Sequence, residues 1–208
     1  MSTMIDMPDK ALHEKCGVFG ALAPVASQGA ASTVATAQSL GELLYYGLYA
    51  LQHRGQETCG MAVFEHDHLR LHKDLGLVSQ VFQDHQVKRL KGQVGVGHTR
   101  YSTAGDGQLA NAQPVIARTP LGALALAHNG NLINPERLLS QFGPFEAEPF
   151  GHESDSWILA QALGAAIERA LSSSDHTGSF EQRRIDAVKG VLDACQGAFS
   201  IVVAMGDC

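Results

Sequence analysis

Short apolar runs, separated by glycine, proline and polar residues, recur along the whole chain. Runs of about four to eight apolar residues that are bounded by turn residues are typical of β-strands. Two pairs of these runs flank short turns, which predicts two β-hairpins. The pattern predicts strands at residues 16–23, 61–65, 69–73, 93–99, 115–119, 123–128 and 197–205.

A second pattern, in which apolar residues return at helical spacing, predicts α-helices at residues 33–52, 135–142, 154–172 and 180–195. Residues that favour helix caps stand before or at the start of three of these segments: Ser32 or Thr33, Asn134 and Ser154. Because the strands form antiparallel pairs while the helices come in blocks, the expected fold class is α+β.

Composition and charge narrow the functions that such a fold can serve. Of the 208 residues, 45% are hydrophobic, and the formal net charge is -6 with acidic and basic residues well mixed. Without a basic stripe, nucleic acid is not an expected partner, and no apolar run is long enough to span a membrane. Residues 1–15 lack the apolar segment of a secretory signal. The four cysteines form no CxxC pair, so we expect no metal site in this chain and a reduced, cytoplasmic setting.

The most informative single residue is Cys16, which is followed at once by Gly-Val-Phe-Gly. If residues 1–15 are a removable leader, Cys16 becomes the first residue of the mature protein. Its thiol is then a nucleophile, and its freed α-amine can take the thiol proton. The alternative is that Cys16 is a small apolar residue in a buried strand.

Two polar segments carry further candidate chemistry. The first, residues 51–57, follows a predicted helix, and its structural interpretation is that Gly55 is a helix C-cap. The second, residues 95–103, places Arg100 directly after a predicted strand. A rigidly held guanidinium there could bind a carboxylate in bidentate fashion. The alternative for Arg100 is an ion pair inside the protein.

Two more segments combine polar side chains with glycine or with a helix start. In the sequence His128-Asn-Gly-Asn, the Asn129 side chain and the Gly130 N–H could form an oxyanion hole. Asn-Gly is also the commonest type I′ turn, so a hairpin turn is the alternative interpretation. The sequence Ser154-Asp-Ser opens a predicted helix, where Ser and Asp commonly act only as caps.

Together these segments resemble the class II glutamine amidotransferases, a family of N-terminal-nucleophile hydrolases. The resemblance covers residues 14–205 and rests on Cys16-Gly-Val-Phe-Gly, Leu51-Gln-His-Arg-Gly-Gln-Glu, Gly97-His-Thr-Arg-Tyr-Ser-Thr, His128-Asn-Gly-Asn and Ser154-Asp-Ser. Within the family, residues 53–57 and 99–103 are most similar to the branch that serves purine synthesis. The resemblance implies a four-layer αββα sandwich of two antiparallel sheets.

The resemblance also implies roles for individual residues. Cys16 would be the nucleophile, with Asn129 and Gly130 holding the oxyanion. Arg100, assisted by Thr103, would bind the α-carboxylate of glutamine, and Asp155 would bind its α-ammonium. Residues 101–114 resemble the mobile glutamine loop of the family.

The domain organisation that follows has two parts. Residues 1–15 are expected to be a propeptide, and residues 16–208 an amidotransferase domain that lacks its last strands. Because the chain stops after an apolar run, we expect exposed apolar surface on residues 197–205 and weak activity at most.

The resemblance further implies that a separate phosphoribosyltransferase domain, absent from these residues, would use the ammonia to convert phosphoribosyl pyrophosphate to 5-phosphoribosylamine. Such an enzyme is a glutamine-dependent glycosyltransferase. Mg²⁺ and an iron–sulfur cluster, if present, are expected in that half, and a homo-oligomer is expected for the full-length enzyme. Three alternatives stay open: a class II amidotransferase with another ammonia acceptor, a catalytically silent binding domain, and a structural fragment.

Overall fold

The structure, a computed structural model, describes residues 16–23, 40–101, 109–145, 154–173 and 178–206. The expected propeptide, the candidate caps Ser32 and Thr33, half of the expected glutamine loop (residues 102–108), and with it Thr103, lie outside the described residues. Strands and helices appear where the apolar patterns predict them, and every strand pairing is antiparallel. The α+β prediction is confirmed.

The first sheet contains four strands in the order β1-β4-β2-β3. They are β1 (Gly17–Leu22), β4 (Val94–Arg100), β2 (Thr58–Glu65) and β3 (His68–Leu75). The predicted hairpin is β2–β3. The central strand β4 pairs with β1 on one side and with β2 on the other. This register brings the start of β1 beside the end of β4, so residues far apart in sequence meet at one edge of the sheet.

The second sheet contains three strands in the order β5-β6-β7. They are β5 (Val115–Thr119), β6 (Gly122–Leu132) and β7 (Gly197–Met205). The predicted hairpin is β5–β6, but β6 continues past the predicted end and includes Asn129 and Gly130. Among the described strands, β7 pairs only with β6.

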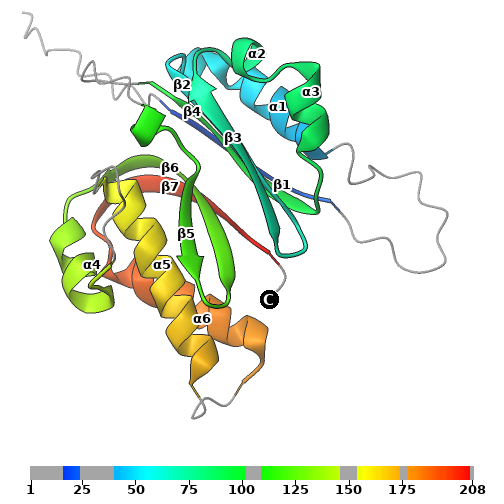
Figure 1. Cartoon of the computed structure of the whole chain (residues 1–208). Coiled ribbons are helices and arrows are strands. Elements are labelled where there is room, and N and C mark those ends of the chain that lie inside the picture. Colours follow the sequence, from blue (N-terminus) through cyan, green and yellow to red (C-terminus); the bar gives the residue numbers. More distant parts are fainter. Residues whose placement is uncertain (1–15, 24–39, 102–108, 146–153, 174–177, 207–208) are drawn as a thin grey trace, which may run out of the picture.

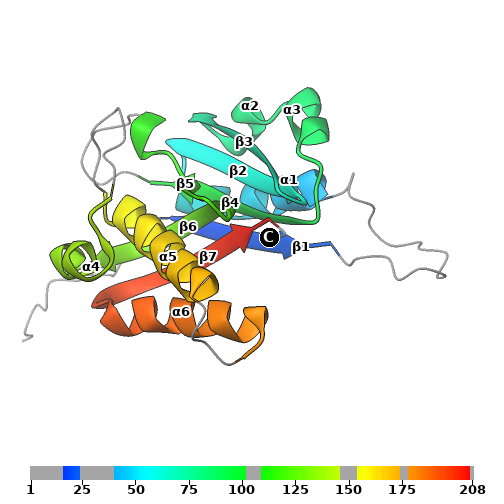
Figure 2. The ribbon, with the colours of Figure 1, turned by 60° about the horizontal axis from the view of Figure 1, so that its bottom comes forward.

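Helices cover the outer face of each sheet (Figures 1 and 2), which confirms the four-layer αββα sandwich. The helices α1, α2 and α3 lie on the first sheet, and α4, α5 and α6 lie on the second. Their bounds are Leu40–Ala50, Val78–Val81, Asp84–Arg89, Pro135–Phe142, Asp155–Ser172 and Phe180–Ala194. Among these described helices, none is long and apolar enough to cross a membrane.

Small side chains dominate the layer between the two sheets. Ala62 of β2, Ala125 and Ala127 of β6 and Ala204 of β7 are buried there with Phe64 and Val96. Alanine lets the two backbones approach closely, so polar groups on one sheet can hydrogen-bond to the other. Separate apolar clusters fill the spaces between each sheet and its helices.

Asn134 is the N-cap residue of α4, as predicted, but its side chain makes no capping hydrogen bond. It instead donates to Ala194 O and accepts from Gln196 N, which ties the start of α4 to the end of α6. The large apolar side chains of β7 are half-buried, not exposed, because Phe199, Ile201, Val203 and Met205 pack against the core beneath α5 and α6.

Candidate functional site

A cavity of about 1020 Å³ lies where the two sheets and the start of α5 meet. It collects residues from β4, β5, β6, β7 and the start of α5, together with Cys16 just before β1 and the segment before β5. Five of the six predicted site residues line it: Cys16, Arg100, Asn129, Gly130 and Asp155. The sixth, Thr103, lies outside the described residues.

Cys16 is half-buried immediately before β1. Its carbonyl accepts a 2.9 Å hydrogen bond from Arg54 Nε, and its Sγ lies 4.0 Å from Tyr101 O. Burial raises the pKa of the Cys16 thiol, while the positive charges of Arg100 and Arg54 oppose this shift. At neutral pH the thiol is therefore protonated, and it needs a base to become a nucleophile.

The segment around Arg54 thus positions Cys16. Gly55 has an extended backbone with φ -159°, so it is not the left-handed helix C-cap that its sequence position indicates. A side chain at Gly55 would instead lie 2.6 Å from the Thr99 carbonyl carbon. Only glycine lets this turn pass close to the end of β4 and bring Arg54 to Cys16.

Arg100 is the last residue of β4 and is half-buried beside the cavity. Its Nη1 donates a 3.0 Å hydrogen bond to Asn111 O. No ion pair with a carboxylate holds Arg100 within the part of the chain that the structure describes, so the alternative of an internal ion pair finds no partner there. The remaining guanidinium donors are available to a ligand in the cavity.

Asn129 and Gly130 lie inside β6 and pair with Ser200 and Phe199 of β7. The type I′ turn interpretation is therefore wrong. Gly130 has a φ of +144°, and a Cβ there would lie 2.3 Å from Ala198 O. Glycine is thus required, and its unusual backbone changes the direction of the strand beside the cavity.

Asp155 is the first residue of α5, but Ser154 is the N-cap because its side chain accepts from Trp157 N at 3.1 Å. The Asp155 carboxylate accepts hydrogen bonds from Leu132 N at 3.2 Å and Ser156 N at 2.7 Å. Its side chain remains 25% exposed, which leaves it accessible from the cavity.

Sequence reasoning missed a group of buried polar side chains next to these residues. Gln113, His128 and Ser156 line the cavity and hydrogen-bond to one another, and His98 joins them from the first sheet. His98 and His128 lie within the motifs at residues 97–103 and 128–131, but those motifs predict no role for the two histidines. Gln113 carries no local signal, because its partners lie in other elements.

Comparisons with known proteins agree with this geometry. No family model matches the chain. The amidophosphoribosyltransferase of Synechococcus elongatus is 41% identical over 199 residues, which are 96% of this chain and 35% of that protein. The amidophosphoribosyltransferase of Mycobacterium tuberculosis is 47% identical over 190 residues, 91% of this chain and 32% of that protein. The chain belongs to the amidophosphoribosyltransferase family. It spans about a third of the length of these curated relatives.

Solved structures of the same family share the fold. The glutamine phosphoribosylpyrophosphate amidotransferase of Bacillus subtilis, complexed with ADP and GMP, superposes with a TM-score of 0.60 at 34% identity. The superposed region covers 80% of this chain and 33% of the Bacillus subtilis chain. The structure of the allosteric regulatory enzyme of purine biosynthesis superposes with a TM-score of 0.63 at 35% identity. The superposed region again covers 80% of this chain and 33% of the other chain. The resemblance inferred from the motifs is confirmed.

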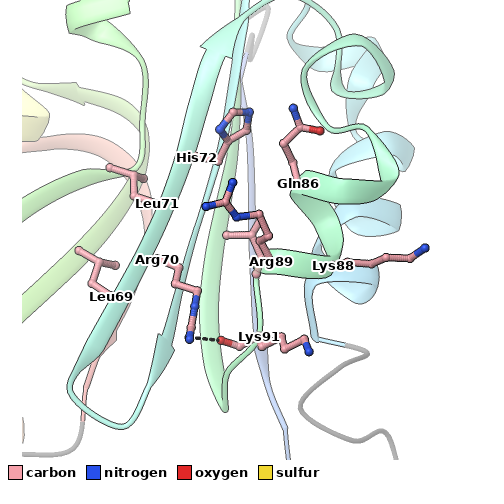
Figure 3. A pocket seen from close by; sticks show the side chains of 9 residues that line it. Leu69, Arg70, Leu71, His72, Gln86, Lys88, Arg89 and Lys91 are labelled. Atoms are coloured by element: carbon pink, nitrogen blue, oxygen red, sulfur yellow. Dashed lines mark hydrogen bonds between the residues drawn. The ribbon is translucent and has the colours of Figure 1, made fainter.

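This amidophosphoribosyltransferase-family domain has a second cavity of about 660 Å³ between β3 and α3 (Figure 3). Its lining is basic and includes Arg70, Lys88, Arg89 and Lys91, but it has no cysteine, serine or carboxylate. Arg70 is already bound to Glu65 and to Lys91 O. The lining of this cavity offers no nucleophile, so we assign the chemistry to the larger one.

The other described cysteines lie away from the candidate site. Cys59 is buried in β2, where burial raises the pKa of its thiol to about 12, and half-buried Cys195 packs against the second core. Both are packing residues. Among the described residues, no group of His, Cys, Asp and Glu could hold a metal ion.

Burial keeps His98 neutral and makes the stability of this domain depend on pH. His98 is fully buried, and its Nε2 donates to His128 O, so its Nδ1 is an unprotonated nitrogen without a partner. Burial lowers the pKa of His98 to about 3. Between this value and the ordinary pKa of about 6.5, the unfolded chain binds a proton that the folded protein does not. Stability therefore falls as the pH falls through this range.

We expect His98 alone to lower the free energy of unfolding by about 2 kcal/mol between pH 7 and pH 5. His98→Gln keeps a side-chain N–H donor but does not titrate, so its unfolding free energy should change less over the same range. Urea unfolding at both pH values measures this. His68→Gln, at an exposed position in β3, is the matched control and should keep the wild-type pH dependence. An unchanged slope in His98→Gln would contradict the assignment.

Proposed function

We propose that the larger cavity is a glutaminase site, at which Cys16 attacks the side-chain amide of glutamine and releases ammonia. The observation that carries this proposal is the convergence on one cavity of a thiol, a guanidinium, an Asn-Gly pair with an unusual backbone, and a carboxylate. These groups come from β4, β6, α5 and the residue before β1, and together they can supply a nucleophile, an oxyanion hole and two charged binding groups.

The charges of the cavity match the two ends of an amino acid. Arg100 offers free guanidinium donors, which suit the α-carboxylate of glutamine. Asp155 offers a partly exposed carboxylate, which suits the α-ammonium. Thr103 is proposed to assist Arg100. A site that reads both charges discriminates against amides that are not amino acids.

The proposed reaction has two steps. Removal of residues 1–15 would free the Cys16 α-amine, which would accept the thiol proton and pass it to the departing ammonia. The sulfur attacks the amide carbon, and the oxyanion would be held by the Asn129 side chain and the Gly130 N–H. The C–N bond then breaks to leave a thioester, and water hydrolyses the thioester to glutamate. With residues 1–15 attached, the Cys16 nitrogen is a peptide amide and cannot act as the base.

In the full-length enzyme, the ammonia would displace pyrophosphate from phosphoribosyl pyrophosphate and form 5-phosphoribosylamine, in the first step of purine synthesis. This proposal is supported by the family membership. The transfer of ammonia, and any Mg²⁺ or iron–sulfur cluster, are expected in the two thirds of the relatives' length that this chain does not span. A homo-oligomer is expected for the full-length enzyme. They stay predictions, as do the cytoplasmic location and the weak activity of this chain alone.

The proposal is tested by labelling with 6-diazo-5-oxo-L-norleucine, an electrophilic analogue of glutamine, followed by intact mass measurement and peptide mapping. We expect the loss of residues 1–15 and one adduct, located on Cys16 and prevented by excess glutamine. A diazoketone without the amino-acid end is the control reagent and should label far more slowly. An adduct on Cys59 or Cys195, or labelling that glutamine does not prevent, would contradict a glutamine site at Cys16.

A further inference from the structure

The Asp155 carboxylate is held by a buried hydrogen-bond network that is centred on Ser156. The Ser156 hydroxyl donates to Asp155 Oδ1 at 3.3 Å, and it lies 2.8 Å from His128 Nδ1 and 3.2 Å from Gln113 Nε2. Ser156 and His128 are only 5% and 2% exposed. A buried hydroxyl that is bound to three neighbours has a fixed position, so it can set the direction of the Asp155 carboxylate, which is the charged group of the network that faces the cavity.

The number of protons determines the direction of each bond. A hydroxyl has one proton and two lone pairs, so Ser156 donates to Asp155 and accepts from both Gln113 Nε2–H and His128 Nδ1–H. His128 is therefore protonated on Nδ1 and bare on Nε2, which is buried without a partner. Burial lowers the pKa of His128 against the influence of Asp155, which is consistent with this neutral form.

Gln113 fixes the strand that carries His128. The paired residues of β5 and β6 end at Val115 and Leu126. Beyond this end, the Gln113 side-chain amide accepts from His128 N at 2.7 Å and donates to His128 O at 3.1 Å. It thus replaces one backbone rung of the sheet, immediately before Asn129.

His98 connects this network to the other sheet. Its Nε2 donates to the same carbonyl, His128 O, at 3.1 Å. The first sheet carries Arg100 two residues after His98, and the second sheet carries Asn129 one residue after His128. The two halves of the site are therefore linked directly through the His128 carbonyl.

With the described residues as its partners, the carboxylate of Asp155 has one acceptor position left for a ligand. A carboxylate offers about four lone-pair positions. Oδ1 accepts from Ser156 N and Ser156 Oγ, and Oδ2 accepts from Leu132 N. The remaining position is on Oδ2, and its direction follows once the other three bonds are made.

We propose that Ser156 and His128 are positioning residues that orient Asp155, and that they thereby make the site selective for ligands with an α-ammonium group. The proposal rests on the proposed function, because it names how that site recognises one end of glutamine. Without the Ser156 hydroxyl, Asp155 keeps its charge but loses one of its bonds, and His128 Nδ1–H loses its acceptor. The two backbone bonds from Leu132 N and Ser156 N remain, but they hold the carboxylate less firmly than three bonds do. A less firmly held carboxylate must be ordered further when the ligand binds, and this weakens binding.

The test is the Ser156→Ala variant of the full chain, titrated by ¹H–¹⁵N NMR with L-glutamate, glutarate and 4-aminobutyrate. L-Glutamate is the expected hydrolysis product and is not turned over. Glutarate lacks its amino group, and 4-aminobutyrate lacks its α-carboxylate. We expect Ser156→Ala to weaken L-glutamate binding by about tenfold, the effect of one hydrogen bond to a charged group. Glutarate binding should be unchanged, so the preference for L-glutamate over glutarate falls about tenfold. 4-Aminobutyrate keeps the amino group and should weaken as much as L-glutamate, so the preference of L-glutamate over 4-aminobutyrate should not change.

Ser179→Ala is the matched control, because it removes a serine hydroxyl that caps α6 and does not line the cavity. It should lower stability and leave the ligand preferences unchanged. Ser156→Thr, which keeps the hydroxyl, should restore the preference. If Ser156→Ala does not fold, Ser156→Cys provides a similar size with a weak donor, and the same loss of preference is expected.

The outcomes separate the two proposals. If the wild-type chain binds glutarate and 4-aminobutyrate as tightly as L-glutamate, the site does not recognise both charges of an amino acid. The proposed function is then refuted. If the wild type shows the preference and a folded Ser156→Ala or Ser156→Cys keeps it, only the positioning role is overturned. The ¹⁵N shifts of His128 give an independent readout, because the wild type should show protonation at Nδ1 and the Ser156→Ala variant a changed tautomer balance.

Discussion

Cys16→Ala is expected to lower the rate of glutamine hydrolysis by at least about 10³-fold and to abolish labelling by the diazoketone. The nucleophile forms the bond on which both later steps depend, and removing it leaves only the binding groups of the cavity. The rate of ammonia release measures hydrolysis, and the intact mass after reaction with the diazoketone measures labelling. Both are measured on the wild type and the variant under the same conditions.

Cys195→Ala is the control for this prediction, since it also removes a half-buried thiol, but one that packs against the second core. It should retain hydrolysis and labelling. If Cys16→Ala keeps more than a tenth of the wild-type rate, the nucleophile must lie elsewhere, and the assignment of Cys16 would be wrong.

Asn129→Ala is expected to lower kcat by about 10²- to 10³-fold with little change in KM, because an oxyanion donor acts on charge that develops in the transition state. Asn129 is half-buried on the cavity, and within the described residues its side-chain amide has no hydrogen-bond partner. It is therefore available to a ligand. Steady-state kinetics with glutamine measures the two constants separately.

Asn134→Ala gives the matching control. Asn134 lies two residues after the end of β6, and its side-chain amide joins the start of α4 to the end of α6. This variant should lose stability in urea unfolding and keep kcat. A rise in KM without a fall in kcat for Asn129→Ala would show that Asn129 binds the ground state and is not an oxyanion donor.

Much of the fold could be predicted because its elements carry local patterns. The start of α5 is an example: Ser154 favours an N-cap, and the apolar positions that follow lie on one helical face, so the helix is visible within a short window. The hairpin β5–β6 is another, because its two apolar runs flank a turn that contains Gly122. The short helices α2 and α3 were not predicted, because each has too few residues to show a helical period.

The candidate site was only partly predictable. Five site residues were named from motifs, yet the same motifs allowed structural interpretations that only the fold could reject. Asn-Gly is usually a turn, and it is part of a strand here because β7 pairs with it along its length. Gln113 gives no signal of its own, since its importance comes from contacts with His128 and Ser156 that are distant in sequence.

The sequence by itself determined the strands and the longer helices, the α+β class, and the chemical nature of the candidate site groups. Propensity, periodicity and side-chain chemistry are local properties. Only the tertiary structure decided that these groups share one cavity, and which hydrogen bonds orient them. The reason is physical: closing long stretches of chain costs conformational entropy that local interactions cannot offset. The packing of the two sheets provides that stabilisation, and it places β1, β4, β6 and α5 around a single site.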